Sequence, residues 1–394
     1  MQKDYSKTVR ACFVGFIVQA IINNFLPLLF VNFNRVYGLP LPKITLLVTF
    51  NFVVQLFVDV LSITFVDRLG YRVSMFLADG LSALGLITLA ILPDLLPDPY
   101  VGIMVSVVLY AVGSGLLEVL LSPIMDSCPS DNKEAAMSLL HSFYCWGHMA
   151  VVLFSTIFFA VFGIERWKIL AILWAIVPTV NLFSFMKVPI GTVVKEGETG
   201  FSIPELLRQK IFWIFLLLMI TSGACEQAVA QWASTLAEKG LGVSKTVGDL
   251  TGPMMFALTM GIARAFYGKN GDRIPLAKFI AGSVTLCVVS YLIIALSPIP
   301  ALGLVGCALT GFAVAILWPG TLSMASGSMP RGGTSMYALL ALGGDIGCSL
   351  GPTYVGFVSD AFGGNFQKGI LCALVFPVLM LVGLFLHKKT KKEI

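Results

Sequence analysis

The sequence predicts an all-α integral membrane protein with twelve transmembrane helices in two six-helix bundles. Of the 394 residues, 57% are hydrophobic and only 12% are charged, whereas a soluble domain carries about a quarter charged residues. The charges separate long apolar segments, which is the pattern expected where lipid surrounds the helices and water meets only their ends. A loop motif also recurs about half the chain length apart, which indicates two related bundles. The lipid bilayer is therefore the expected surroundings of the chain.

Twelve apolar segments have about the twenty residues that one span needs. They cover roughly residues 8–33, 43–66, 72–93, 100–127, 135–161, 166–187, 210–237, 246–268, 275–296, 299–326, 334–360 and 366–387. No small-residue cleavage site follows the first segment, so we interpret it as a retained span and not as a signal peptide.

A polar stretch divides the chain into an N-terminal bundle (1–187), a cytoplasmic linker (188–209) and a C-terminal bundle (210–394). The linker contains the run Lys195–Gly200, which is too polar to be buried. Ser202 and Glu205 have the Ser-x-x-Glu spacing of a helix start, so the linker is expected to end in a short surface helix.

The cations predict the orientation. The predicted inner segments hold most of the 26 lysines and arginines, including Lys388, Lys389, Lys391 and Lys392 near the end of the chain. The positive-inside rule then places both termini in the cytoplasm of a multi-pass protein of the cell membrane, with a bacterial inner membrane expected. The small net charge of +5 is explained by this topology, and we expect no nucleic-acid partner.

The eight cysteines occur singly and without a partnering histidine pattern, mostly within apolar segments. They are expected to be small buried residues and not disulfides or metal ligands. His141 and His148 share a helix face but have no third ligand, so no metal site is predicted. We expect no cofactor and a monomeric chain.

The repeated loop motif is Asp67-Arg68 after the second segment and Asp272-Arg273 after the eighth. These residues resemble the signature of the major facilitator superfamily, which has an Asp-Arg loop between helices two and three and a weaker copy between helices eight and nine. The sequence departs from the signature at Ile63, where the family has glycine, but Gly268 provides that glycine in the second copy.

The charges near these loops are expected to form a cytoplasmic latch that stabilises one conformation through charge-assisted hydrogen bonds between helix ends. The alternative is that they are solvated loop charges. The predicted latch residues are Asp67, Arg68, Arg72, Asp126, Arg264, Asp272 and Arg273.

Four acids within the predicted spans stand out: Asp59, Glu118, Glu226 and Asp345. An acid near the bilayer centre costs roughly 2.5 to 3.5 kcal/mol on insertion scales, so each is a candidate functional group. A carboxyl group in a low-dielectric site favours its neutral form and can exchange a proton when the site opens to water. All four are therefore candidates for proton coupling, and the alternative for Glu118 is a permanent helix-to-helix hydrogen bond.

Three segments resemble the fucose permease branch of the superfamily. The segment 113–123 is similar to its G-x-G-x-x-E-x-x-x-N-P motif, with Ser122 in place of Asn. The segment 140–147 is similar to its N-x-x-H-x-x-Y-G region, with an insertion before the glycine, and 223–232 is similar to its G-x-E then W pattern. The resemblance implies that Glu118 is linked to proton coupling in a sugar symporter.

A polar stripe runs along the second segment, where Asn51, Gln55 and Asp59 follow at steps of four. Asp59 and Arg264 each lie eight residues before a loop aspartate, so opposite charges occupy equivalent positions. We hypothesise that they act together in a gate, with Asp345 as a candidate partner. Separate ion pairs within each bundle are an equally good explanation.

Glycines at 343, 347 and 351 share one face of the eleventh segment and are expected to allow close helix crossing. The solute is expected near the midplane between the halves. Amides satisfy hydroxyl groups and aromatic rings stack on C–H faces, so a sugar or sugar-like polyol is the predicted solute. The candidate substrate-binding residues are Gln19, Asn23, Asn24, Glu118, His141, Trp146, Glu226, Gln227, Gln231, Trp232 and Trp318.

The predicted function is secondary active transport, namely proton-coupled uptake of this solute by alternating access. The first alternative is proton-antiport efflux of drugs or other amphipathic compounds, since amide and aromatic linings also serve such molecules. A non-transporting membrane sensor is a third interpretation. An enzyme is not expected, because the sequence has no nucleophile–base pair, zinc pattern or phosphate loop.

Overall fold

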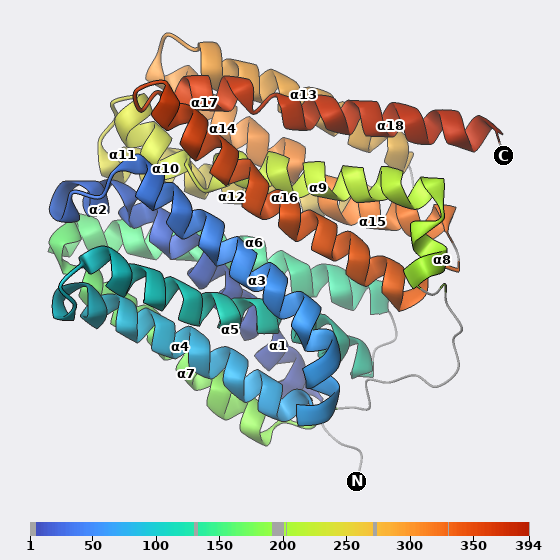
Figure 1. Cartoon of the computed structure of the whole chain (residues 1–394), viewed down its shortest axis with the longest axis horizontal. Helices are drawn as coiled ribbons and strands as arrows, with labels where there is room; N and C mark the ends of the chain where they lie inside the picture. The colour runs from blue at the N-terminus through green and yellow to red at the C-terminus, as the bar shows by residue number, and fades with distance from the viewer. Residues whose placement is uncertain are drawn as a thin grey trace. The chain divides into compact units, whose positions relative to one another are not determined.

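In the computed structural model, helices are the only regular secondary structure among the residues that it describes (Figure 1). These are residues 5–129, 133–190, 201, 203–270, 274–329 and 331–393. The side chains of 63–65, 67, 68, 126, 133–138, 268–270, 333–335, 337, 338 and 391–393 are outside this description.

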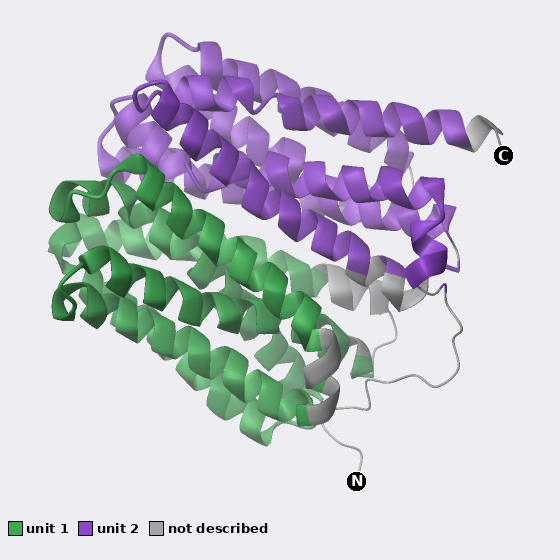
Figure 2. Ribbon diagram, in the orientation of Figure 1, with its two compact units in different colours: residues 1–195 green, residues 196–394 purple. Residues whose placement is uncertain are grey.

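The chain divides into two compact units, Met1–Lys195 and Glu196–Ile394 (Figure 2). The boundary between them falls within the predicted linker 188–209. A short helix, α8 (Ile203–Leu207), follows at the position where the Ser-x-x-Glu spacing predicts one.

Unit 1 contains the first six predicted spans, with boundaries that differ from the predictions by a few residues. Its elements are α1 (Ser6–Phe25), η1 (Leu26–Leu29), α2 (Phe30–Tyr37), α3 (Leu41–Leu69), α4 (Tyr71–Leu95), α5 (Pro99–Ser127), α6 (Lys133–Phe162), η2 (Ile164–Arg166) and α7 (Trp167–Lys187).

Unit 2 contains the other six, several of which are interrupted. After α8 its elements are α9 (Lys210–Ala230), α10 (Ala233–Thr235), η3 (Leu236–Gly240), α11 (Lys245–Thr251), α12 (Pro253–Asn270), α13 (Leu276–Leu296), α14 (Pro300–Val314), α15 (Leu317–Ser328), α16 (Gly333–Ala361), α17 (Phe366–Cys372) and α18 (Val375–Glu393).

Within the described residues, ten helices are long and apolar enough to cross a membrane. The two predicted spans that do not meet this measure are also helical, since α11 and α12 cover 246–268 and α16 covers 334–360. The break between α11 and α12 lies at Gly252 and Pro253, because proline has no backbone N–H to continue the preceding helix.

The two units repeat one pattern of helix pairing. In unit 1, α1 packs on α6, and α5 packs on both α3 and α4. In unit 2, α9 packs on α16, and α14 packs on both α12 and α13. The corresponding crossings use corresponding glycines: a Cβ on Gly115 would lie 3.1 Å from the Gln55 carbonyl oxygen of α3, and one on Gly311 would lie 2.1 Å from the Phe256 carbonyl oxygen of α12. The internal repeat inferred from the loop motif thus extends to the packing of the helices.

The predicted glycine face of α16 lies directly against α9. An added Cβ at Gly347 would lie 1.9 Å from the Ile220 carbonyl oxygen, and one at Gly351 would lie 2.5 Å from the Ala224 carbonyl oxygen. The backbones therefore approach more closely than any side chain would permit, as the spacing of these glycines predicts.

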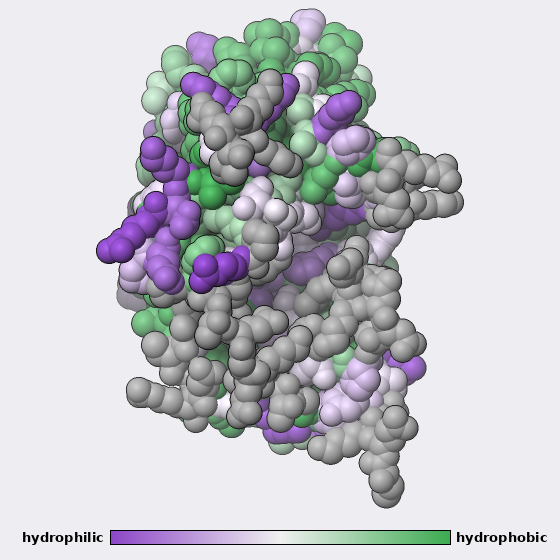
Figure 3. Space-filling view, turned by 90° about the vertical axis from the view of Figure 1, so that its right-hand side faces the viewer, coloured by the Kyte–Doolittle hydropathy of each residue, from purple (hydrophilic) through white to green (hydrophobic). Residues whose placement is uncertain are grey.

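The helix ends near α8 are polar, as expected where a helix leaves the membrane. Figure 3 looks onto this side, and hydrophilic side chains lie there among apolar ones. Glu205, Arg208 and Lys210, at α8 and the start of α9, are exposed.

Candidate functional site

The candidate site in unit 1 starts from three buried amides of α1. Gln19, Asn23 and Asn24 are each at most 5% exposed in a helix that is otherwise largely apolar. A buried amide is costly unless its donors and acceptors find partners. The partners that these three residues find define how α1 is joined to its neighbours.

Gln19 joins α1 to the acid of α5. Its Nε2 donates to a carboxylate oxygen of Glu118 at 2.9 Å. The sequence places both residues among the candidates but does not pair them. The structure therefore brings a predicted proton carrier and a predicted solute ligand into direct contact.

Asn23 is the centre of a second amide network. Asn51 and Gln55 of α3 both donate to its Oδ1, at 3.1 and 3.0 Å, and Ser114 of α5 donates to Gln55 Oε1 at 3.1 Å. Asn51 and Gln55, which belong to the polar stripe predicted on the second span, thus face α1 and α5. Three helices are joined by polar side chains at this level.

Asp59 continues that stripe one turn beyond Gln55. Carboxylate oxygens of Asp59 and Glu118 lie within 4.8 Å of each other. Two charges at this separation repel by about 3 to 4 kcal/mol at an effective dielectric constant of about 20. A proton or another cation shared between the two acids would remove this repulsion.

The α1–α6 side of unit 1 is more aromatic. Asn24 donates to the Ala20 carbonyl at 2.9 Å and to Tyr144 Oη at 3.3 Å. The His141 ring lies edge-on to Phe16 with 5.0 Å between centroids. Trp146, the predicted aromatic ligand of α6, is 42% exposed. Unit 1 therefore has an amide and carboxyl side and an aromatic side.

In unit 2 the predicted ligands of α9 bond to one another. Gln227 donates to Glu226 at 3.2 Å, and Gln231 donates to Gln227 at 3.0 Å. Trp232 is fully buried, and its Nε1 donates to the Pro352 carbonyl of α16 at 2.9 Å. The indole of Trp232 thus stabilises the α9–α16 pair.

Trp318 and Asp345, the other predicted site residues of unit 2, belong to α15 and α16. The Trp318 ring covers Gly344, where an added Cβ would lie 2.1 Å from the ring. Asp345 is the next residue of α16 and is 7% exposed. Gly344 thus leaves room for the indole immediately beside an intramembrane acid.

Arg264, a predicted latch residue, lies on α12. Its Nε donates at 3.2 Å to the carbonyl of Ala315, which lies between α14 and α15 where the helical hydrogen-bond ladder is interrupted. This hydrogen bond lies within unit 2, and the gate and its alternative both stay predictions.

Arg72, another predicted latch residue, caps α7. Its Nη1 donates to the carbonyls of Phe185 and Met186, both at 2.7 Å, and its Nη2 donates to that of Val188 at 2.8 Å. These carbonyls belong to the end of a helix, where they lack helical partners. The other predicted latch residues, Asp67, Arg68, Asp126, Asp272 and Arg273, have side chains outside the described part of the structure.

One buried acid was not among the predicted site residues. Asp79 of α4 has no exposed surface, and Nδ2 of Asn181 on α7 lies 3.2 and 3.1 Å from its two carboxylate oxygens. Among the described residues, Oδ1 of Asn181 has no hydrogen-bond partner. The sequence does contain a sign of this site, because Asp79 is an acid that interrupts the apolar run of the third predicted span.

A second unpredicted acid is Asp249 of α11. It is 1% exposed, accepts a hydrogen bond from Ser234 at 2.5 Å and forms an ion pair with Lys245 at 2.9 Å. Lys245 lies one helical turn before it, so the spacing of four is the sequence signal for this pair. Both partners lie near the end of a span, and the contact with Ser234 fixes α11 to α10.

Comparison with known proteins identifies the fold. The family model described as Major Facilitator Superfamily matches residues 11–352 and 253–393. No curated protein sequence matches significantly. A variant of the Escherichia coli fucose:proton symporter FucP has a similar structure, with a TM-score of 0.67 at 16% identity over 98% of this chain and 99% of that one.

Two further solved structures have the same fold. A D-xylose-proton symporter gives a TM-score of 0.78 at 14% identity over 97% of this chain and 96% of that one. A bacterial homolog of the human lysosomal transporter Spinster gives 0.78 at 15% identity over 99% and 98%. The TM-scores show that the fold is shared, and at identities of 14% to 16% the likeness concerns the fold alone.

Proposed function

This chain belongs to the Major Facilitator Superfamily and is a multi-pass membrane transporter, and we propose that it couples the uptake of a small polar solute to protons. The proposed solute is a sugar or sugar-like polyol. The observation that carries the proposal is the contact of Glu118 with Gln19 beside Asp59. Symporters for fucose and for D-xylose are among the similar folds, which is in keeping with a sugar.

In the proposed cycle, Gln19 connects the proton to the solute. When Glu118 is charged, it accepts a charge-assisted hydrogen bond from Gln19 Nε2, which is stronger than a bond to a neutral acid. A proton on Glu118 weakens that bond and frees the Gln19 amide for a solute hydroxyl. Protonation therefore favours solute binding, which is the order that symport requires.

Asp59 makes the proton easier to bind at this point. Its carboxylate, within 4.8 Å of Glu118, adds negative charge that a proton neutralises. The surrounding amides of Asn23, Asn51 and Gln55 hold α3 in place, so this acid is kept near Glu118. We propose that the two acids act as one proton-binding unit.

The first experiment identifies the solute. A thermal-shift screen of the purified protein against sugars, polyols, nucleosides and hydrophobic cations at two pH values is suitable, because a ligand at 100 times its dissociation constant adds about 2.7 kcal/mol of stability. Stabilisation by a sugar supports the proposal. Stabilisation by hydrophobic cations alone would contradict it and favour proton-antiport efflux.

The coupling role is tested in proteoliposomes with Glu118→Gln. We expect the variant to lose accumulation driven by a pH gradient but to keep exchange of solute across the membrane, because the amide keeps the shape of the carboxyl group without its proton. Glu165→Gln makes the same change at an exposed acid of η2 and is the control. Accumulation by Glu118→Gln at the control's level, or accumulation driven by a sodium gradient instead, would contradict proton coupling at this site.

A further inference from the structure

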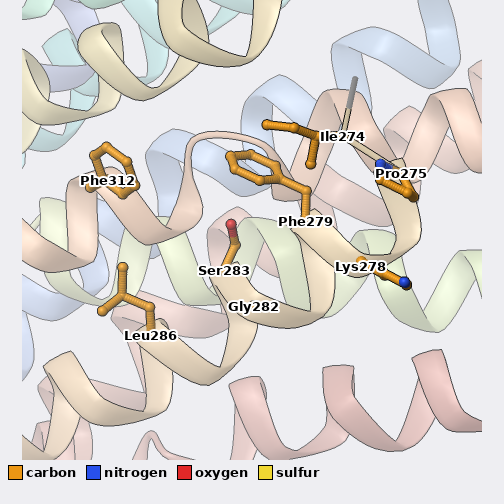
Figure 4. Close-up of a pocket in the computed structure, with 8 residues that line it drawn as sticks. All are labelled: Ile274, Pro275, Lys278, Phe279, Gly282, Ser283, Leu286 and Phe312. Carbon is orange, nitrogen blue, oxygen red and sulfur yellow. The ribbon is translucent and has the colours of Figure 1, made fainter. Parts of the chain in front are cut away.

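A groove lies along one face of α13 within unit 2 (Figure 4). Its volume is about 360 Å³, at the lower end of the range of small-molecule pockets. It is lined by Ile274, Pro275, Lys278, Phe279, Gly282, Ser283, Leu286 and Phe312. All but Phe312 of α14 come from α13 or from the residues just before it, so the groove follows the helix axis.

The groove has one charged end and an otherwise largely apolar wall. Lys278 lies near the start of α13, beside Pro275, while Leu286 and Phe312 lie at the other end (Figure 4). Lys278 is exposed, and among the described lining residues it is the one that carries a charge. The Phe279 ring is kept in place by the Tyr267 ring of α12, with 4.8 Å between centroids.

Gly282 makes the groove continuous between these two ends. It is exposed, and a Cβ placed on it would meet no atom within 4 Å. The residues Lys278, Gly282 and Leu286 follow at steps of four, which puts them on one face of the helix. From Lys278 to Leu286 the helix rises about 12 Å at 1.5 Å per residue, so the groove is long and narrow.

We propose that this groove binds an anionic phospholipid. The phosphate pairs with the Lys278 ammonium, and one acyl chain lies along Gly282 against Phe279, Leu286 and Phe312. A lipid is the occupant that suits these features, because exposed apolar surface on a membrane-spanning helix meets acyl chains. The cation at the helix end provides the charge complementarity that selects an acidic headgroup.

The position of Lys278 fits this occupant. A lysine near a helix end extends its ammonium to the level of the headgroups while its methylene stem stays in the apolar region. Lys278 also belongs to a segment that the distribution of cations predicts to be cytoplasmic, and that leaflet carries anionic lipids. The cation of the groove would thus lie at the level of the phospholipid headgroups, and its apolar wall at the level of the acyl chains.

The test is native mass spectrometry of the full-length protein with phosphatidylglycerol or phosphatidylcholine added in detergent. We expect Gly282→Leu to abolish the tightest phosphatidylglycerol adduct, because its side chain fills the open space of the groove. We expect Lys278→Gln to weaken that adduct about five-fold, the equivalent of about 1 kcal/mol for one cation near the membrane surface. Phosphatidylcholine binding should weaken less, because the choline cation offsets the charge of the phosphate.

Gly327→Leu is the matched control. Gly327 is an exposed glycine of α15 outside the groove, and a Cβ there also meets no atom within 4 Å. This variant should bind phosphatidylglycerol as the unmodified protein does. Full retention of the adduct by Gly282→Leu would overturn the proposed groove. Equal binding of the two lipids, unaffected by Lys278→Gln, would overturn the preference for an anionic headgroup.

Discussion

Two acids in the helices of unit 1, Glu118 and Asp79, have different partners and, we expect, different roles. Glu118 accepts a hydrogen bond from an amide and lies within 4.8 Å of a second acid, so a change of its charge alters both interactions. The Asp79 carboxyl group has no exposed surface and bonds to Asn181 of α7. We therefore propose that the first takes part in coupling and that the second links α4 to α7.

The Asp79–Asn181 contact would be completed by a proton. A protonated Asp79 could donate to Asn181 Oδ1, which has no partner among the described residues, while Nδ2 of Asn181 donates to the other carboxyl oxygen. An asparagine at 79 could form the same reciprocal pair. We expect Asp79→Asn to change the free energy of unfolding little, and Asp79→Leu to lower it by about 1 to 3 kcal/mol because it leaves the Asn181 amide buried without that partner.

Denaturant or thermal unfolding of the purified variants measures this difference. The double variant Asp79→Leu with Asn181→Leu is the control, since replacing both buried partners by apolar groups restores part of the loss. An Asp79→Asn variant as unstable as Asp79→Leu would show that the charged carboxylate is what the fold requires.

At the scale of elements, the pairing of α9 with α16 depends on the absence of side chains at the crossing. A methyl group on Gly347 would lie 1.9 Å from the Ile220 carbonyl oxygen, so α9 and α16 must separate to accept it. We expect Gly347→Ala to destabilise unit 2 by about 1 to 3 kcal/mol, the usual cost of overpacking. This loss should appear even though alanine favours the helix over glycine by about 1 kcal/mol.

Gly327→Ala makes the same change in α15, where the added methyl group meets no atom within 4 Å. Only the gain in helix propensity remains there, so this variant should be as stable as the unmodified protein or slightly more stable. Thermal unfolding of the two variants in the same detergent compares them. Equal stability would mean that the close crossing is not needed.

At the scale of the whole molecule, the number, order and approximate bounds of the helices could be predicted, because lipid imposes a strong hydrophobic signal on each span. The breaks at Pro27 and Gly252–Pro253 have local signals as well. The side-chain pairs of the site could not be predicted. Whether Gln19 meets Glu118 depends on the rotation of α1 against α5, which long apolar helices do not encode in their periodicity.

The same limit explains the remaining differences. Arg264 donates to the Ala315 carbonyl, and this contact could not be predicted, because the sequence pattern does not reveal the helix break between α14 and α15. That Asp59 and Arg264 act together in a gate stays a prediction. The role of Asp79 could not be predicted, because one acid in an apolar run shows neither its depth nor its partner, and Asn181 lies 102 residues away.

The orientation of the whole chain is a prediction from its cations that single-cysteine labelling can test. All eight native cysteines are free and are buried or half-buried, so they should react little with a membrane-impermeant maleimide. Glu165 in η2 and Glu205 in α8 are exposed acids. They lie in segments between spans that the positive-inside rule places on opposite sides of the membrane. We expect Glu165→Cys to be labelled in intact cells and Glu205→Cys only after the membrane is opened.

Both variants make the same chemical change, so each is the control for the other. The reverse pattern would place the termini, and with them Lys278, outside the cytoplasm.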